Sequence, residues 1–331
     1  MTVTIGRREL LAALGGAAAV WPLAARAQQP AIPLIGFLNN TTPKTYEPFV
    51  TSFRRGLGQV GYIEGMNVAI EYRWGRNESD RLPNLAKELV QRGVTVLVAS
   101  GGDQAVRAAQ AATQTIPIVA TIGSDPVETG LVRSLNRPEG NITGVSVFAV
   151  QLVAKRLELA REFAPEGVAI AFLTNPNNSN YKIDIREIDE AAKPLGQKII
   201  ILHAGTEDEC DAAFAELAQQ PIGALIVQDD PFFNEITVHL VVSAARRSIP
   251  VVFSRREFAV AGGLLSYGTS LTEAYRQVGI YTGRILKGAK PTELPILLPS
   301  RYELVLNLKT AKALRIAVPT SVLVGADEVI E

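Results

Sequence analysis

The sequence predicts an α/β protein built from two lobes, each a parallel sheet flanked by helices. Short apolar runs of strand length alternate with longer segments whose apolar residues recur every three or four positions. This alternation occupies residues 33–148 and starts again at residue 152. Strands that alternate with helices in this way form parallel sheets covered on both faces, so each run predicts one lobe.

In the first run, the predicted strands end at polar turns and several helices end at glycines. The expected strands are 33–38, 68–74, 94–99, 117–122 and 141–148, and the expected helices are 49–60, 82–92, 103–114 and 127–135. Gly61 and Gly93 can end two of these helices in a left-handed conformation. Pro126 suits the first turn of the last helix, because its missing N–H would have no partner there.

The second run repeats this logic without a close sequence repeat. Its expected strands are 168–173, 198–203, 224–227, 250–253 and 263–267, and its expected helices are 152–163, 183–195, 210–217 and 236–245. A long helix at 274–286, an extended connector at 294–298, a strand at 302–308 and a short helix at 311–314 complete the chain.

Three connections link the two predicted lobes, near Phe148, Gly268 and Leu297. Several short crossings between two lobes suit a hinge. We therefore expect an N-terminal lobe of residues 28–148 plus 269–297. The C-terminal lobe then comprises residues 149–268 plus 298–331.

The composition agrees with two folded lobes. The chain has 331 residues, of which 47% are hydrophobic and 20% are charged, so it holds enough apolar material for two cores. Its formal net charge is zero, which favours neither a nucleic-acid surface nor a polybasic membrane patch. The single cysteine, Cys210, cannot form an intramolecular disulfide and is expected to be a buried, inert thiol.

The first 27 residues are typical of an export signal. Arg7 and Arg8 form a basic start, residues 10–25 are apolar, and Ala25-Arg26-Ala27 fits a cleavage site. The apolar run is too short for a comfortable membrane span. The arginine pair is compatible with both the twin-arginine route and the general one. We expect cleavage after Ala27 and a mature protein in the periplasm.

Polar residues gather where the predicted strands end, and these turns form the candidate binding site. In open α/β sheets, small ligands bind at the carboxyl ends of the strands. The candidate residues are Asn39, Asn40, Ser100, Gly101, Gly102, Asp103, Gly123, Ser124 and Asp125 from the first lobe, and Asn175, Asn178 and Asp229 from the second. Tyr267, at a crossing, could stack on a ligand or pack in the hinge.

The strand ends offer two kinds of polar group. Backbone N–H donors at the turns of Ser100 and Ser124 suit a ligand carboxylate. Carboxylates at Asp125 and Asp229 suit an ammonium or a hydroxyl group. A small amphoteric solute, such as an amino acid, satisfies both. The alternative for the first turn is a tight strand-to-helix connection that Asp103 caps.

Asp229 and Asp230 are adjacent, so on a strand their side chains would point to opposite faces. At most one of them is therefore expected to face the site. The alternative role for this pair is to cap the segment that begins at Pro231.

The sequence gives no pattern typical of an enzyme, a cofactor site or a metal site. Gly56, Gly58 and Gly61 match G-x-G-x-x-G, but they close a helix, whereas a dinucleotide site needs them directly after a strand. His203 and His239 have no partner at metal-ligand spacing. The nucleophile elbow G-x-S-x-G does not occur.

The stretch SDPVETGLVRSLNRPEGNITGVS at residues 124–146 is the most specific of several stretches that recur in one protein family. The others, in chain order, are FRRGLGQVGYIEGMNVAIEYRW, LAKELV, AATQTIPIV, KRLEL, AGGLLSYG, GRILKGAKPTELPI and LNLKTAKALRIAVP. Together they resemble ABC-transporter substrate-binding proteins of the tryptophan/tyrosine-binding type. The resemblance covers essentially the whole mature chain. It departs at SGGDQA, where related proteins often carry Thr-Pro-Ala-like residues in place of Gly102 and Asp103.

The resemblance implies a type I periplasmic-binding-protein fold, with two Rossmann-like lobes, a three-crossing hinge and a ligand held between the lobes. It also implies delivery of that ligand to ABC permease membrane subunits, and members of known specificity bind aromatic amino acids. We expect a monomeric receptor for a small amphoteric solute, without a cofactor and without a nucleic-acid partner. Two alternatives stay open: a receptor that presents its ligand to a membrane sensor, and an enzyme on the same fold.

Overall fold

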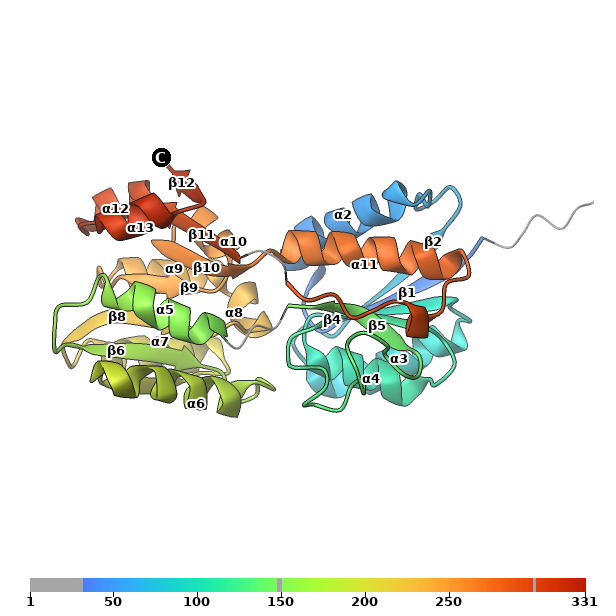
Figure 1. Cartoon of the computed structure of the whole chain (residues 1–331), viewed down its shortest axis with the longest axis horizontal. Coiled ribbons are helices and arrows are strands. Elements are labelled where there is room, and N and C mark those ends of the chain that lie inside the picture. The colour runs from blue at the N-terminus through green and yellow to red at the C-terminus, as the bar shows by residue number, and fades with distance from the viewer. Residues whose placement is uncertain (1–31, 148–150, 300–301) are drawn as a thin grey trace, which may run out of the picture. The chain divides into compact units, whose positions relative to one another are not determined.

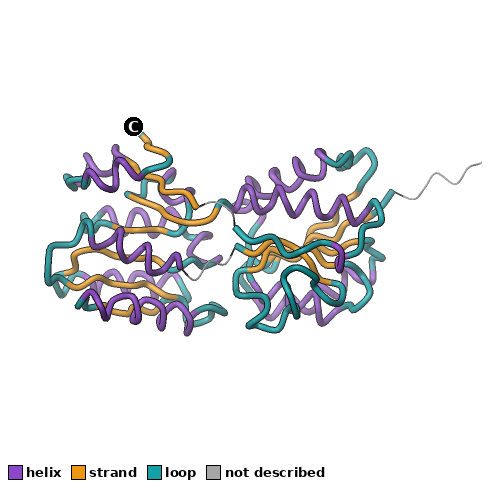
Figure 2. Tube along the Cα trace, viewed as in Figure 1, coloured by secondary structure: helices purple, strands orange, loops and turns teal. Residues whose placement is uncertain are grey.

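Two sheets organise the chain, and helices cover both faces of each sheet (Figures 1 and 2). The computed structural model describes residues 32–147, 151–299 and 302–331. Residues 34–331 form one compact unit. The predicted export signal, residues 1–27, and the predicted crossing at Phe148 lie outside the described residues.

The first sheet is five-stranded and entirely parallel, in the order β2-β1-β3-β4-β5. Its strands are β1 (Leu34–Asn39), β2 (Ala69–Trp74), β3 (Val96–Ser100), β4 (Ile118–Ile122) and β5 (Ile142–Ser146). We call this sheet and its helices the N-lobe. Because its strands are parallel, their carboxyl ends meet at one edge, and Asn39 pairs there with Ser100.

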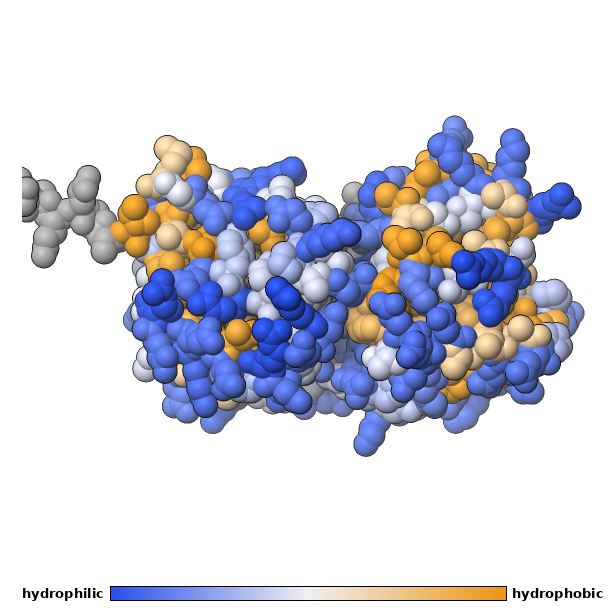
Figure 3. Space-filling view, turned by 180° about the vertical axis from the view of Figure 1, so that it is seen from behind, coloured by the Kyte–Doolittle hydropathy of each residue, from blue (hydrophilic) through white to orange (hydrophobic). Residues whose placement is uncertain are grey.

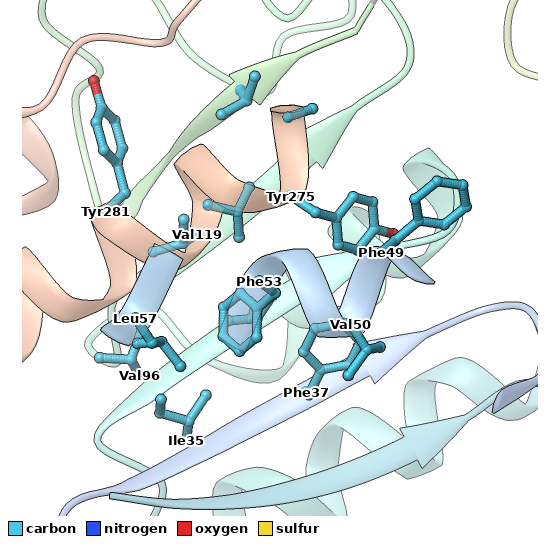
Figure 4. Packing of buried hydrophobic residues seen from close by; sticks show 14 of the residues in the cluster. Ile35, Phe37, Phe49, Val50, Phe53, Leu57, Val96, Val119, Tyr275 and Tyr281 are labelled. Carbon is cyan, nitrogen blue, oxygen red and sulfur yellow. The ribbon is translucent and has the colours of Figure 1, made fainter. Parts of the chain in front are cut away.

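Helices pack on both faces of this sheet. They are α2 (Pro43–Gln59), η1 (Ser79–Arg81), α3 (Leu82–Gln91), α4 (Asp103–Ala112), α11 (Leu271–Leu286) and η3 (Pro291–Glu293). On one face, α2 and α11 bury Phe37, Phe53 and Tyr275 in a single core, in which the Tyr275 ring lies beside Phe49 (Figure 4). On the other face, α3 and α4 cover a second core.

Two glycines allow α2 and α11 to approach closely. A Cβ atom at Gly56 would lie 1.9 Å from the carbonyl oxygen of Arg276, and one at Gly279 would lie 2.1 Å from that of Phe53. Gly61 follows α2 with a φ of 91°, as expected for a helix end. The G-x-G-x-x-G spacing therefore serves helix packing and helix termination.

The second sheet is seven-stranded, in the order β12-β11-β10-β9-β8-β6-β7. Its strands are β6 (Ala169–Thr174), β7 (Ile199–His203), β8 (Ile222–Val227), β9 (Val251–Phe253), β10 (Leu265–Thr269), β11 (Tyr302–Asn307) and β12 (Glu328–Ile330). Its neighbouring strands are parallel except β10 and β11, which pair antiparallel. After β10 the chain leaves this sheet, forms α11 and η3, and returns to the sheet as β11, which runs antiparallel to β10.

The helices around this sheet complete what we call the C-lobe. They are α5 (Gln151–Arg161), α6 (Tyr181–Ala192), η2 (Lys193–Leu195), α7 (Glu207–Leu217), α8 (Pro231–Glu235), α9 (Thr237–Ala245), α10 (Arg256–Val260), α12 (Leu308–Leu314) and α13 (Thr320–Gly325). They cover two cores, one on each face. Cys210 is fully buried in the first, and burial raises the pKa of its thiol to about 12, so the thiol is inert as expected.

The helix predicted after Pro126 does not form. Asp125 accepts hydrogen bonds from the backbone N–H groups of Val127 and Glu128, which closes only a turn. Gly130 then adopts a φ of 70°, and the chain runs irregularly to β5. Leu131 is nevertheless buried against the α3 and α4 side of the sheet. The apolar spacing that indicated a helix thus reflects burial of a loop.

The chain connects the two lobes after β5, after β10 and after η3. Thr269 and Ser270 form the second connection, next to the predicted crossing at Gly268. Leu297 bridges Val145, so it still belongs to the N-lobe before the third connection. None of the helices in the described ranges is long and apolar enough to cross a membrane. The face shown in Figure 3 is mostly hydrophilic, with hydrophobic residues in scattered patches.

Candidate binding cleft

A cleft lies where the carboxyl ends of strands from both lobes face each other. The turns after β3 and β4 line it from the N-lobe, and the turns after β6, β8 and β9 line it from the C-lobe. Its empty volume, part of it open to solvent, is about 850 Å³.

The N-lobe rim is built on a glycine turn. Gly101 and Gly102 have φ angles of 76° and 116°, which side chains rarely tolerate. A Cβ atom at Gly101 would also lie 2.4 Å from the side-chain oxygen of Asn39. Gly102 is the N-cap of α4, so the turn brings backbone to the cleft and starts a helix there.

Asp103 joins this turn to the next one. Its Oδ1 accepts a hydrogen bond from the backbone N–H of Gly123, at 2.8 Å. Its Oδ2 accepts from the hydroxyl of Ser179 in the C-lobe, at 3.2 Å. The N–H of Gly123 is therefore already occupied by protein and is not a free donor for a ligand.

A polar cluster supports the rim from below. The side-chain nitrogen of Asn39 donates to Ser100 Oγ at 2.9 Å and to Tyr275 Oη at 3.4 Å, and its oxygen accepts from Thr41. Asn39 and Ser100 are fully buried. Burial raises the pKa of Tyr275 to about 12, so its hydroxyl stays protonated. The rings of Tyr275 and Tyr46 pack against each other and line the cleft.

The C-lobe contributes an ion pair. Arg255 donates from Nε and Nη2 to the two carboxylate oxygens of Asp229, at 2.9 and 2.7 Å. Its Nη1 donates to the hydroxyl and carbonyl oxygens of Thr269. Arg255 is 5% exposed, so a buried guanidinium is neutralised by a two-bond pair, the strong geometry for such contacts.

Asp230 is the N-cap of α8, which is the alternative role that the sequence suggested for the adjacent residues Asp229 and Asp230. Its carboxylate accepts from the backbone N–H groups of Phe232 and Phe233, and from the side-chain amides of Asn175 and Asn178. Burial raises its pKa, which these hydrogen bonds oppose. Asp229 and Asp230 both line the cleft, contrary to the expectation for a strand. Alternation does not apply to them, because β8 ends at Val227.

Two further charged groups reach the cleft from helices. Arg156 on α5 is 2% exposed and donates from Nε to the carbonyl oxygen of Tyr267, at 2.8 Å. Asp184 on α6 accepts from Gln228 Nε2 at 2.7 Å. Burial raises the pKa of Asp184 to about 6, against the opposing effects of Gln228 and of the Arg156 charge. Burial lowers the pKa of Arg156, which Asp229 and Asp184 oppose.

Three buried polar atoms of cleft-lining residues have no hydrogen-bond partner among the described residues. They are Nη2 of Arg156, Oδ1 of Asn180 and Oδ1 of Asn234. The Asn180 amide is oriented by its nitrogen, which donates to the carbonyl oxygen of Gly123 at 2.5 Å. The cleft therefore presents one cationic donor and two neutral acceptors that a ligand can complete.

The structure brings only part of the predicted site to the cleft. Lining it are Gly101, Gly102, Asp103, Gly123, Asn178 and Asp229. Asn39, Ser100 and Asn175 lie behind these residues and support them. Asn40 contacts Ser79, Ser124 contacts Thr129, and Asp125 closes its own turn. Tyr267 packs on Tyr302, and its backbone carbonyl orients Arg156.

The charged groups that the sequence analysis missed divide into two kinds. Arg255 is the second residue after the predicted strand 250–253, so the rule that polar strand ends face the site would have found it. Arg156 and Asp184 lie within helices, where a charged residue usually belongs to the solvent-exposed face. Nothing in their local sequence indicates burial.

Two similar proteins are described with an aromatic amino acid as their ligand. The chain is 27% identical over 268 residues to a tyrosine-binding protein of Clostridioides difficile (strain R20291), covering 79% of this chain and 75% of that protein. It is 25% identical to a Streptococcus pneumoniae ABC domain in complex with L-Trp, with a TM-score of 0.81 and coverage of 91% and 100%.

A conserved domain protein of Vibrio cholerae shares the fold at 24% identity, with a TM-score of 0.82 and coverage of 90% and 99%. The profile of the family described as ABC transporter substrate binding protein matches residues 44–330. Members of this family bind substrates for transport and are not enzymes. The chain therefore belongs to the family of ABC transporter substrate-binding proteins.

Proposed function

We propose that this protein captures a small amino-acid-like solute in the cleft and delivers it to an ABC-type import permease. The observation that carries the proposal is the set of unpartnered atoms, the donor Arg156 Nη2 and the acceptors Asn180 Oδ1 and Asn234 Oδ1, in a cleft that both lobes line. A zwitterion offers a carboxylate to the donor and an ammonium group to an acceptor. The carboxylate of Asp184 lies at the same cleft and adds a negative charge for the ammonium group.

The wall of the cleft favours a ligand with an apolar or aromatic part. Tyr46, Val147, Leu271 and Tyr275 line it from the N-lobe side, and Leu152 and Val153 line it from α5. A ligand ring that packs on either tyrosine would gain contacts beyond the area that it buries. The similar proteins named for tyrosine and found with L-Trp support this assignment.

The setting that we propose is the periplasm. The basic start, the apolar run and Ala25-Arg26-Ala27 support export and cleavage, which leaves Gln28 as the mature N-terminus. N-terminal sequencing of protein from a periplasmic extract tests this. An intact Met1 on the functional protein in the cytoplasm would contradict the proposed setting.

The ligand itself is best found by mass spectrometry of the small molecule that co-purifies with periplasmic protein. Calorimetric titration of the standard amino acids into protein that has been unfolded, dialysed and refolded then measures affinity without the native ligand. We expect a zwitterion with an aromatic or apolar side chain to bind most tightly. Co-purification of a neutral sugar, with no heat from any amino acid, would show the proposal to be wrong.

A further inference from the structure

The two guanidinium groups of the cleft differ in one respect. Arg255 uses Nε, Nη1 and Nη2 in bonds to Asp229 and Thr269. Arg156 has one bond from Nε to a backbone carbonyl, and its Nη2 has no partner within the described ranges. Arg156 is also nearly fully buried, at 2% exposure. A buried cationic donor without a partner is costly, so it points to a partner that the chain itself does not supply.

Arg156 itself lines the ligand space. Leu152 and Val153, one turn earlier on α5, line the same cleft, so this face of the helix is the one that a ligand meets. The Nε bond to Tyr267 fixes the guanidinium against β10. Because that bond uses a backbone carbonyl, it holds the group in place without neutralising its charge.

The nearby carboxylates are committed to other partners. Asp229 accepts both of its bonds from Arg255, and Asp184 accepts from Gln228. On the opposite rim, the carboxylate of Asp103 accepts from Gly123 and Ser179. Asp103 also stands at the start of α4, where it repels a second anion from the N-lobe glycine turn.

We propose that Arg156 of the C-lobe binds the carboxylate of the ligand, and that the N-lobe glycine turn does not. This inference rests on the proposed function and assigns one end of the ligand. The ligand is then a monoanion at that end, because four carboxylates line the cleft around this open donor and would repel a phosphate dianion. The ammonium group lies toward Asn180 Oδ1, one of the two open amide acceptors of the cleft.

The test compares each acid with its own carboxamide. L-Tryptophan and L-tyrosine, and their primary carboxamides, are titrated into the wild-type protein by calorimetry. The amide keeps the ring and the ammonium group and removes only the negative charge. We expect the acid to bind about 10- to 100-fold more tightly, the range for a hydrogen bond to a charged group.

Arg156→Met removes the guanidinium and is expected to abolish that preference, so that acid and amide bind with similar, weak affinity. Arg156→Lys keeps the charge on a different donor and should retain part of the preference. Arg247→Met is the matched control, because Arg247 is a partly buried guanidinium that lies over Phe214, away from the cleft. It should leave both affinities unchanged.

Each outcome separates this inference from the proposed function. If no amino acid binds the wild-type protein, the proposed function is wrong and the inference falls with it. If acid and amide bind the wild type equally, the receptor role stands and the inference is overturned, whether or not Arg156→Met folds. A folded Arg156→Met variant that keeps the full preference for the acid also overturns it.

Discussion

The two rims of the cleft consist of different kinds of residues. The N-lobe rim is a glycine turn, two tyrosine rings and a carboxylate that hydrogen bonds already occupy. The C-lobe rim is a set of charged side chains on α5, α6 and the turns after β8 and β9. The comparison teaches that the N-lobe sets the shape of the site, whereas the C-lobe sets its charge.

This difference has a thermodynamic consequence. A change in the N-lobe rim should act through steric strain, which neither pH nor salt alters. A change in the C-lobe rim should leave a buried charge without its partner, so its effect should depend on pH or on a second charge. The predictions below test this division, in order of decreasing effect.

Asp229→Ala should have the largest effect, because it leaves the buried guanidinium of Arg255 unpaired. We expect the free energy of unfolding to fall by about 3–5 kcal/mol, the range for breaking a buried ion pair from one side. Urea denaturation measures it. From the sequence, Asp229 was expected to contact an ammonium or hydroxyl group of the ligand, whereas the structure pairs it with Arg255.

The double variant Asp229→Ala/Arg255→Met provides the control. Removing the second charge should restore part of the lost stability, because no buried cation is then left alone. If the single variant unfolds at the same urea concentration as the wild type, the pair does not hold the C-lobe rim together.

Asp184 should make stability depend on pH. Its pKa rises from 3.8 to about 6 on folding, so the folded state holds a proton that the unfolded state has lost. The stability from this group is therefore present below about pH 4 and is lost as the pH rises through about 6. Asp184→Asn should be more stable than the wild type above pH 6, by about 2–3 kcal/mol.

Urea denaturation at a series of pH values between 4 and 8 follows this difference. Asp189→Asn on the same helix is the matched control, because its side chain is exposed and the substitution should change stability by no more than about 0.5 kcal/mol. A constant stability difference between Asp184→Asn and the wild type over this range would contradict the raised pKa. Arg156, Asp229 and Glu187 carry the other charges that act on this group.

Gly101→Ala tests the steric side of the comparison. The substitution places a side chain at a φ of 76° and brings its Cβ against Asn39, so we expect a loss of about 2 kcal/mol. Gly58→Ala on α2 is the control, because no atom lies near its Cβ position and alanine favours a helix. Unlike the effect of Asp184, the loss should be the same at pH 5 and pH 8.

The same division explains how much of the site could be predicted from the sequence. The glycine turn at residues 101–102 lies directly after a strand, and the position of a strand end follows from local apolar patterning. The charges of Arg156 and Asp184 reach the cleft only because α5 and α6 pack as they do on the C-lobe sheet. Burial of that kind depends on tertiary packing, which no window of sequence records.

The fold was more predictable than the site, for a related reason. Strand and helix periods recur over many residues, so single errors matter little, and both sheets follow the predicted alternation. The false helix at residues 127–135 shows the limit. Its apolar spacing matched a helix, but the positive φ of Gly130 turns the chain, and the buried side chains belong to a loop.

The smallest expected effect concerns one of the hydrogen bonds that join the two rims. The hydroxyl of Ser179 donates to Asp103 across the cleft, and both residues line the cleft. A bond made only when the rims are together favours the closed state, and a ligand that contacts both rims favours it too. Ser179→Ala should therefore weaken ligand binding by about 1 kcal/mol, or about fivefold.

A double-mutant cycle with Asp103→Ala separates this bond from the others that Asp103 makes. The free energy of unfolding should stay within about 0.5 kcal/mol for Ser179→Ala, because its side chain is exposed and makes no other bond that a folded lobe needs. The sum of the affinity losses of the two single variants should exceed the loss measured for the double variant, because both single variants remove the same hydrogen bond. Strictly additive losses would mean that Ser179 and Asp103 act independently. Closure of the two rims would then depend on their other hydrogen bonds, of Asn180 with Gly123 and of Gln104 with Asn177.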